Sequence, residues 1–280
     1  MGMGWGSGMV RLAYRGAGWS DAGEEHAIAS LLPLPPGARI LDIGIGGGRT
    51  TSFLEHAGTT YEGIDVTPEM VTDAHKRYPE ANIHVGDASH LEAIPDASFE
   101  LIVFSLNGVD CLDHATREQF LRECARLLTP GGVLQFSTHN LEGPCFREVP
   151  SWQDAKERFA KPGLAAKAEA VLGGVPRLVL ARRNIKKHAT LQPEGDGWAM
   201  APLRAHEFRF VCHFATLAEV RESLARAGLV VEAIWTNTGS RVPLDAVTYE
   251  DAFAQLVCRK PPVVIDLAEQ RQSSETTQPS

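Results

Sequence analysis

A glycine-rich stretch constrains the fold of this chain more than any other feature of its sequence. Residues 40–43, Ile-Leu-Asp-Ile, can form a short strand, and glycines follow at positions 44, 46, 47 and 48. Glycine allows positive φ and lets a ligand lie against the main chain with no Cβ between them. Residues 49–56 can form a helix whose first N–H groups point into the same space. The stretch predicts a strand, a ligand-binding turn and a helix, with a purely structural turn as the alternative.

The spacing of the glycines separates this turn from two common ones. The dinucleotide fingerprint has a glycine or alanine at its sixth position, where this chain has Arg49. The phosphate-binding P-loop ends in Gly-Lys-Ser/Thr, which is absent here. What remains is the pattern Asp42-x-Gly44-x-Gly46-x-Gly48.

Acidic residues follow the next two expected strands. Asp65 ends the apolar run 61–64, about twenty positions after the glycine turn, where a carboxylate can accept hydrogen bonds from ribose hydroxyls. Thr67 and Pro68 already supply the N-cap and first position of the next helix, so we expect Asp65 to be free for a ligand. Asp87 follows the expected strand 82–85 and is either a second ligand contact or an ordinary turn residue.

The rest of the chain alternates between strands and helices. Strands are expected at 99–104, 133–137, 229–235 and 253–258. A helix over about 115–128 has one apolar face, which makes Cys124 a core thiol, and Thr216 and Glu219 form a capping box for another helix. Segment 141–215 is too long for a connection and predicts a subdomain, with helices near 152–160 and 164–172 and extended pieces near Leu178 and 208–214.

Together with Asp65, Asp87 and the run Leu-Leu-Thr-Pro-Gly-Gly-Val-Leu at 127–134, the glycine pattern resembles the class I S-adenosylmethionine-dependent methyltransferases of small-molecule type. The resemblance implies an α/β fold: a doubly wound, mostly parallel seven-stranded sheet with helices on both faces and 253–258 as an antiparallel edge strand. It also implies an N-terminal lid segment (1–32), a cofactor-binding domain (33–140 and 216–265), an inserted substrate-binding cap (141–215) and a disordered tail (266–280).

The same resemblance implies S-adenosyl-L-methionine (SAM) as the cofactor and S-adenosyl-L-homocysteine (SAH) as its product. In the family, an acidic residue at the position of Asp87 meets the adenine amine, and the next backbone N–H meets a ring nitrogen. An N-terminal aromatic residue often closes the pocket, a role open to Tyr14 and less so to Trp19. The implied cofactor-binding residues are Tyr14, Asp42, Gly44, Gly46, Gly48, Asp65, Val66, Met70, Asp87, Ala88, Ser105 and Leu106.

The catalytic residues are expected where the fourth and fifth strands end, because ligands lie outside the carboxyl ends of parallel strands. His139 is the candidate general base, with a structural role at the start of the insertion as the alternative. Asn107 is a candidate for orienting the substrate or the cofactor. His206 and His213 could reach the pocket or be structural. No metal site is predicted, because Asp110, Asp113 and His114 suit a turn and a helix cap better than a coordination shell.

The acceptor is expected to be a small molecule with an N, O or C nucleophile, in specialised metabolism. The net charge of −8 argues against nucleic acid, and the segment 107–110, Asn-Gly-Val-Asp, lacks the Pro-Pro pair of the family's amino-methylating nucleic-acid enzymes. Arg177, Arg182, Arg183, Lys186 and Lys187 form either a solvated face or a contact for an anionic substrate. A protein or RNA methyltransferase and a catalytically silent cofactor-binding partner remain the alternatives.

The cysteine spacing and the length of the apolar runs indicate the compartment in which the chain is expected to work. The five cysteines have no Cys-x-x-Cys spacing, which favours thiols in a reducing cytoplasm. No apolar run approaches the ~18 residues of a membrane span. A homodimer is an open possibility.

Overall fold

A computed structural model describes residues 20–55, 60–150, 178–189, 192–206 and 208–262. Within these residues ten strands form one sheet. They are β1 (Arg39–Ile43), β2 (Thr60–Asp65), β3 (Ile83–Val85), β4 (Phe99–Phe104), β5 (Leu128–Asn140), β6 (Glu194–Gly195), β7 (Trp198–Pro202), β8 (Val211–Ala215), β9 (Val230–Thr236) and β10 (Phe253–Arg259).

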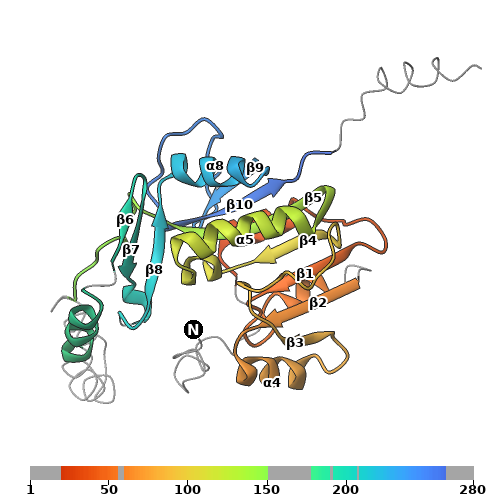
Figure 1. Ribbon diagram of the computed structural model, residues 1–280, viewed down its shortest axis with the longest axis horizontal. Helices are drawn as coiled ribbons and strands as arrows, with labels where there is room; N and C mark the ends of the chain where they lie inside the picture. The colour runs from red at the N-terminus through yellow and green to blue at the C-terminus, as the bar shows by residue number, and fades with distance from the viewer. Residues whose placement is uncertain (1–19, 56–59, 151–177, 190–191, 207, 263–280) are drawn as a thin grey trace, which may run out of the picture.

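The central part of the sheet is parallel, in the order β3-β2-β1-β4-β5. Two groups of strands join it at β5. Antiparallel β10 pairs along Val133–His139 of β5 and carries β9 on its other edge. Strand β8 pairs in parallel with the last two residues of β5, His139 and Asn140, and continues into antiparallel β7 and β6. We call β6–β8 the sheet extension. Figure 1 shows it standing beside the main sheet.

Helices cover both faces of the main sheet. The α-helices are α2 (Ala22–Ala29), α3 (Thr51–Leu54), α4 (Pro68–Arg77), α5 (His114–Leu127) and α8 (Leu217–Arg226), and the 3-10 helices are η1 (Gly108–Cys111) and η2 (Arg204–His206). Residues 178–188 are also helical. The strand alternation divides the core between the two faces. Leu41 and Ile102 pack with α5 and α8, whereas Ile40 and Val103 pack with α2, α3 and α4.

The doubly wound, mostly parallel α/β fold is confirmed, and three expectations are wrong. The sheet has ten strands instead of seven, because segment 141–215 contributes β6–β8. Strand β10 is antiparallel but lies inside the sheet, between β5 and β9, instead of at its edge. Leu178 lies in a helical stretch instead of an extended piece.

Several predictions fall outside the described residues. Tyr14, Trp19, the helices near 152–160 and 164–172, and the tail 266–280 are among them. The division into lid, cofactor domain and cap therefore stays a prediction. Among the helices that the structure describes, none combines the length and apolar character needed to cross a membrane.

Candidate functional site

A cavity of about 730 Å³ opens at the carboxyl ends of the parallel strands. One wall comes from the main sheet and includes the glycine turn, the end of β2 and the segment after β4. The opposite wall comes from the helical stretch 178–188 and from the chain around the sheet extension. This is the position at which open α/β sheets bind their ligands, and the volume is typical of small-molecule sites.

The glycine turn brings backbone to the cavity wall. Gly44, Gly46 and Gly48 all have positive φ. A Cβ on Gly44 would lie 2.7 Å from Cε2 of Phe104, so only glycine fits between the turn and β4. Asp42 lies behind the turn. It is almost fully buried and accepts hydrogen bonds from Thr50 Oγ1 (2.6 Å) and Tyr61 Oη (2.8 Å). Burial raises the pKa of Asp42 to about 6, against the opposing effect of these two hydroxyls.

Asp65 is held by backbone N–H groups at the end of β2. Its Oδ2 accepts from Gly46 N (2.9 Å) and its Oδ1 from Thr67 N (2.8 Å). These two contacts orient the carboxylate, and each oxygen keeps a lone pair for a ligand, so the role of Asp65 in ligand binding stays a prediction. Burial raises the pKa of Asp65, against the lowering effect of the two N–H groups.

Asp87 is less buried and sits in a tight turn after β3. Its Oδ1 accepts from the backbone N–H and hydroxyl of Ser89, and Oδ2 lies 3.6 Å from His90 Nδ1. Burial alone would raise the pKa of Asp87, but the Ser89 hydrogen bonds and the nearby His90 lower it. The two carboxylates thus line the same cavity from neighbouring strands.

A buried ion pair that the sequence did not suggest fastens α2 to the cavity wall. Glu24, which is fully buried, accepts from Arg49 Nη2 at 2.7 Å. Ser105 receives a hydrogen bond from Arg49 (2.9 Å) and donates one to Glu24. Arg49 and Ser105 line the cavity, so the network joins α2, the glycine turn and the end of β4 at one point.

The segment after β4 is strained. Leu106 and Asn107 both have positive φ, which is costly for residues other than glycine and is common at functional sites. Asn107 Nδ2 lies 3.2 Å from His139 Nε2, and Asn107 Oδ1 is buried without a hydrogen-bond partner among the described residues. The two candidate catalytic side chains are therefore in contact, as their positions after β4 and in β5 suggested.

His139 also contacts Asp110 of η1. Asp110 Oδ2 accepts from the backbone N of His139 (2.7 Å) and lies 2.8 Å from His139 Nδ1, without the alignment of a full hydrogen bond. Behind Asp110 lies Arg117 of α5, with Nε 3.9 Å from Asp110 Oδ1. Burial lowers the pKa of Arg117, against the raising effect of Asp110.

The other two candidate histidines differ in exposure, since His213 is fully buried and His206 is half-buried. Burial, with a smaller effect from Arg117, lowers the pKa of His213 to about 2. His213 Nε2 lies 3.1 Å from Nδ1 of His114, whose ring stacks on Trp198. Burial and the nearby His139 lower the pKa of His206 to about 4.

The cavity therefore brings most, but not all, of the candidate residues together. Lining it are Gly44, Gly46, Asp65, Val66, Met70, Asp87, Ala88, Ser105 and Leu106. Asp42, Gly48, Asn107 and His139 do not line the cavity, and Tyr14 is outside the described residues. Lys187, His188 and Arg209 contribute basic side chains from the opposite wall, and only Lys187 belongs to the cluster noted in the sequence.

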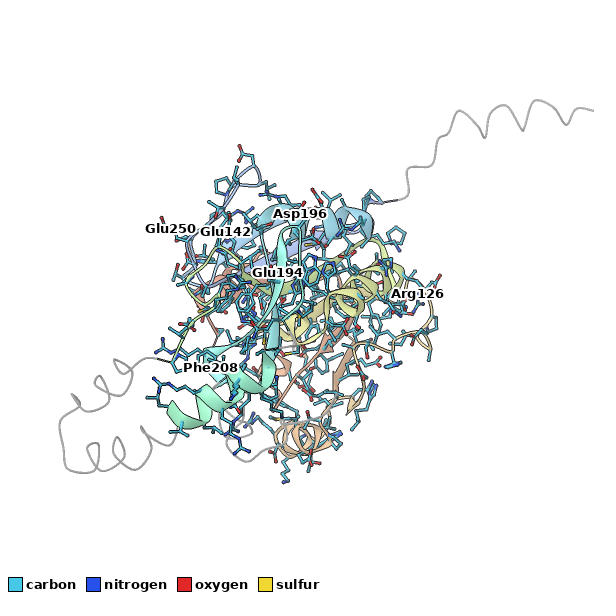
Figure 2. All side chains as sticks on the ribbon, turned by 60° about the vertical axis from the view of Figure 1, so that its left-hand side comes forward. Arg126, Glu142, Glu194, Asp196, Phe208 and Glu250 are labelled. Atoms are coloured by element: carbon cyan, nitrogen blue, oxygen red, sulfur yellow. The ribbon has the colours of Figure 1, made fainter. Side chains whose placement is uncertain are left out.

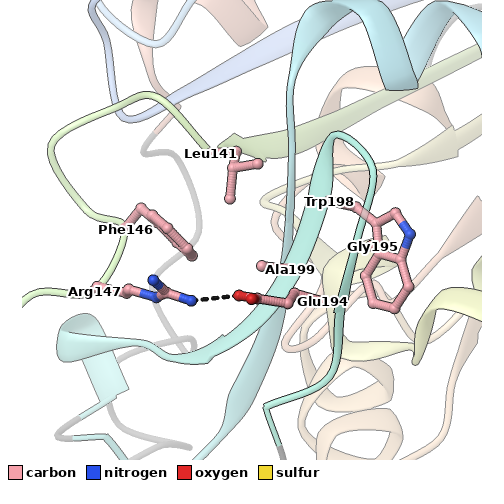
Figure 3. Close-up of a pocket in the computed structure, with 7 residues that line it drawn as sticks. All are labelled: Leu141, Phe146, Arg147, Glu194, Gly195, Trp198 and Ala199. Carbon is pink, nitrogen blue, oxygen red and sulfur yellow. Dashed lines mark hydrogen bonds and ion pairs between the residues drawn. The ribbon is translucent and has the colours of Figure 1, made fainter.

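Two further features lie away from the cavity. Potential metal-ligand atoms of His114, Glu118 and Glu219 fall within 4.8 Å of one another, but Arg226 pairs with both glutamates. A shallower cavity of about 410 Å³ separates Phe146 from the β6–β7 hairpin, and the Arg147–Glu194 ion pair (2.5 Å) crosses it (Figure 3). The cavity in Figure 3 contains no candidate site residue.

Comparison with known proteins agrees with this geometry. Residues 41–136 match the sequence model of a family described as "Methyltransferase domain". A ubiquinone biosynthesis O-methyltransferase from Xanthomonas campestris is 35% identical over 109 residues, which are 38% of this chain and 44% of that relative. The match thus spans less than half the length of the curated relative.

Solved structures show the same fold at low identity. A SAM-dependent methyltransferase from Methanosarcina mazei has a TM-score of 0.51 and 19% identity, covering 82% of this chain and 95% of its own. The 1,6-didemethyltoxoflavin-N1-methyltransferase of Burkholderia thailandensis, with its substrate and SAH bound, has a TM-score of 0.50 and 15% identity, covering 86% and 79%.

The fold and the glycine-rich cavity together place a candidate ligand site at the carboxyl edge of a mostly parallel sheet. Residues 41–136 thus match a methyltransferase domain in sequence, and the fold is the one found in the SAM-dependent methyltransferase structures named above.

Proposed function

We propose that this chain transfers the methyl group of SAM to an O, N or C nucleophile of a small molecule. The observation that carries the proposal is the cavity of about 730 Å³ whose main-sheet wall has the features of a nucleoside site and whose other wall is basic. A cavity of this size suits a small acceptor better than a protein or RNA surface. The relatives named for ubiquinone biosynthesis and for 1,6-didemethyltoxoflavin support a ring-containing acceptor.

The main-sheet wall would hold the cofactor. Asp65 would accept from the ribose hydroxyls, and Asp87 and the N–H of Ala88 would meet the adenine. Val66 and Met70 supply apolar contact for its ring. The glycine turn, Ser105 and Leu106 would surround the amino-acid end. Asp42 and Gly48 would act indirectly by holding the turn.

The basic wall would select an anionic acceptor. Lys187 and Arg209 line the cavity opposite Asp65 and Asp87. His188 lies 3.0 Å from the carbonyl oxygen of Arg209, a contact that joins the helical stretch to the chain before β8. A carboxylate or phosphate on the acceptor would be attracted to this wall and repelled by the carboxylates of the other, so the charges orient it.

The chemistry left to the protein is mainly positioning. Bound SAM supplies an already activated methyl group, and orientation of the acceptor can contribute about 7–11 kcal/mol. Asn107 would orient the nucleophile. His139 would take the proton that a hydroxyl or amine loses, an effect of about 10²–10⁴-fold.

The proposal is tested by methyl transfer from SAM with a heavy methyl group into fractionated host extract, read by mass spectrometry. A labelled small molecule is the expected result, and its identity would show whether the acceptor belongs to specialised metabolism or to quinone synthesis. Label on protein or RNA would overturn the small-molecule proposal. Tight SAH binding without label in any fraction would favour a silent partner.

Cofactor binding is tested with SAH by calorimetry. Asp65→Ala should lose most of the affinity, because it removes the acceptor for the ribose hydroxyls. Asp245→Asn, at an exposed loop residue, is the matched control and should bind like the parent. Equal affinity in all three proteins would remove Asp65 from the proposed site.

The basic wall is tested by charge reversal once the acceptor is known. Lys187→Glu should raise KM for an anionic acceptor with little change in SAH affinity. Lys186→Glu changes the neighbouring exposed residue, which does not line the cavity. Equal effects of the two variants would mean that the basic residues form only a solvated face.

A further inference from the structure

Four side chains form a continuous buried row from the middle of the molecule to the cavity. Arg117 Nε lies 3.9 Å from Asp110 Oδ1, and Asp110 Oδ2 lies 2.8 Å from His139 Nδ1. His139 Nε2 lies 3.2 Å from Asn107 Nδ2, and Leu106 and Gly108 on either side of Asn107 line the cavity. Helix α5, η1, the end of β5 and the segment after β4 each contribute one residue.

The charges at the inner end of this row are completely removed from solvent. Asp110 and Arg117 both have 0% exposure. None of the three guanidinium nitrogens has a hydrogen-bond partner among the described residues, and Asp110 is the carboxylate paired with Arg117 there. A buried charge is costly unless an opposite charge compensates it. Since the guanidinium has little else to bind, its charge acts mainly on Asp110.

The surroundings of Asp110 determine where the His139 proton lies. Thr138 Oγ1 donates to Oδ1 (2.8 Å) and the His139 backbone N donates to Oδ2 (2.7 Å), so the carboxylate cannot turn away. An ionised carboxylate only accepts, and a nitrogen lone pair 2.8 Å from it would be repelled. The nearby carboxylate therefore favours a proton on His139 Nδ1, which in the neutral ring leaves the lone pair on Nε2, toward Asn107.

We propose that Asp110 and Arg117 are positioning residues that hold His139 in the Nδ1–H tautomer and so make Nε2 the catalytic base. The inference rests on the proposed function. The acceptor hydroxyl or amine replaces the Asn107 amide at Nε2. As its oxygen or nitrogen bonds to the methyl carbon, the carbon–sulfur bond breaks with its electron pair left on sulfur. The acceptor proton passes to Nε2, and the resulting imidazolium is stabilised by Asp110.

The first test reads the tautomer without any substrate. The full chain is labelled with nitrogen-15 histidine, and the ring nitrogens of His139 are assigned by comparison with His139→Gln. The parent should show a protonated Nδ1 and an unprotonated Nε2. Asp110→Asn can present an N–H to Nδ1 and should move the proton to Nε2. An unchanged tautomer in Asp110→Asn would overturn the proposal.

Arg117 is tested with a neutral and a conservative variant. Arg117→Met removes the charge and should mix the tautomers, whereas Arg117→Lys keeps the charge and should largely restore Nδ1–H. Arg122→Met, at an exposed position of the same helix, should leave the spectrum unchanged. If Arg117→Met fails to fold, Arg117→Lys and Asp110→Asn still test whether these residues set the tautomer of His139. A Lys variant that folds with mixed tautomers counts against the role of Arg117.

Activity provides the second readout, with the acceptor identified by the methyl-transfer screen. His139→Gln should lower kcat by about 10²–10⁴-fold, and Asp110→Asn by a comparable factor with similar KM. The double variant should lose little more, because the two residues act as a unit. SAH binding should be unchanged throughout. A protein that shows the expected tautomers but neither binds SAH nor transfers methyl would refute the proposed function. The role of Asp110 and Arg117 in setting the tautomer of His139 would still stand.

Discussion

At the scale of single residues, the most informative side chains are charged ones on apolar helix faces. Glu24 lies one turn before Ala27 and Ile28 of α2, and Arg117 lies one turn before Phe120 and Leu121 of α5. Both charged residues are fully buried. A charged residue in an apolar stripe is visible in sequence, and it indicates a buried partner because an uncompensated charge there would destabilise the fold.

The residues that pair with Glu24 and Arg117 could not be identified from the sequence. Glu24 contacts Arg49 and Ser105 across sequence separations of 25 and 81 residues. Arg117 of α5 pairs with Asp110, which the sequence had suggested only as part of a turn and helix cap. By contrast, Asp65 and Asp87 were found from local signals, since Asp65 ends β2 and Asp87 comes two residues after β3. Sequence therefore predicted the cavity wall that depends on strand ends and missed the networks that depend on packing.

Asp42 should make the stability of the protein depend on pH. Its pKa is raised from 3.8 to about 6, so the folded state is penalised once the carboxyl ionises. The penalty is about 3 kcal/mol at pH 8 and about half of that at pH 5. The unfolding free energy of Asp42→Asn relative to the parent should therefore rise by about 1.4 kcal/mol between pH 5 and pH 8.

Chemical denaturation at a series of pH values measures this difference. Asp245→Asn serves as the control and should track the parent at every pH, because Asp245 is exposed. A constant offset between Asp42→Asn and the parent would show that burial does not perturb this carboxyl.

At the scale of elements, helix ends and strands were predicted well where local chemistry decides them. Helix α4 begins at Pro68 after Thr67, as the sequence indicated. The capping box before α8 is only half formed. Thr216 Oγ1 accepts from Glu219 N (3.2 Å), but the Glu219 carboxylate accepts from Ser223 and Arg226 instead of reaching back.

The β6–β7 hairpin of the sheet extension was missed for a physical reason, whereas the extended piece expected at 208–214 corresponds to β8. Strands β6 and β7 are joined by a tight turn at Asp196 and Gly197, and β6 has only two residues, too few for an alternating pattern. In Figure 2, Asp196 and Phe208 mark opposite ends of this extension in front of the main sheet. Its position is set by pairing with β5, a long-range contact that no local pattern encodes.

The observed half of the capping box leads to a prediction for α8. Thr216→Ala removes the side-chain acceptor for the Glu219 N–H and should lower the unfolding free energy by about 1 kcal/mol. Urea denaturation with an unchanged m-value would measure it. Thr248→Ala, at an exposed loop position, is the matched control. A loss no larger than the control's would mean that the other contacts of α8 determine where the helix begins.

At the scale of the whole molecule, buried neutral histidines should limit stability in acid. The pKa of His213 is lowered from 6.5 to about 2, so below pH 6.5 the unfolded chain binds a proton that the folded protein does not. Stability therefore falls as pH falls, by about 2 kcal/mol between pH 7 and pH 5 from this residue alone. The His213→Asn variant should lose less stability over that interval, whatever its stability at pH 7.

Global unfolding followed by circular dichroism at pH 5 and pH 7 gives the two values needed. His75→Asn changes an exposed histidine on α4 and should keep the acid sensitivity of the parent. Equal losses in the parent and in His213→Asn would assign the acid sensitivity to other groups.

The branch in the sheet has a mechanical consequence. Strand pairing joins the extension to β5 through only two residues, His139 and Asn140, which pair with Phe214 and Ala215. Because His139 is one of these two residues, a displacement of β6–β8 relative to the main sheet would also act on the residue that faces Asn107. The position of the cavity wall formed by the sheet extension and the orientation of the His139 imidazole are therefore coupled. A substitution that weakens the β5–β8 pairing would disturb both.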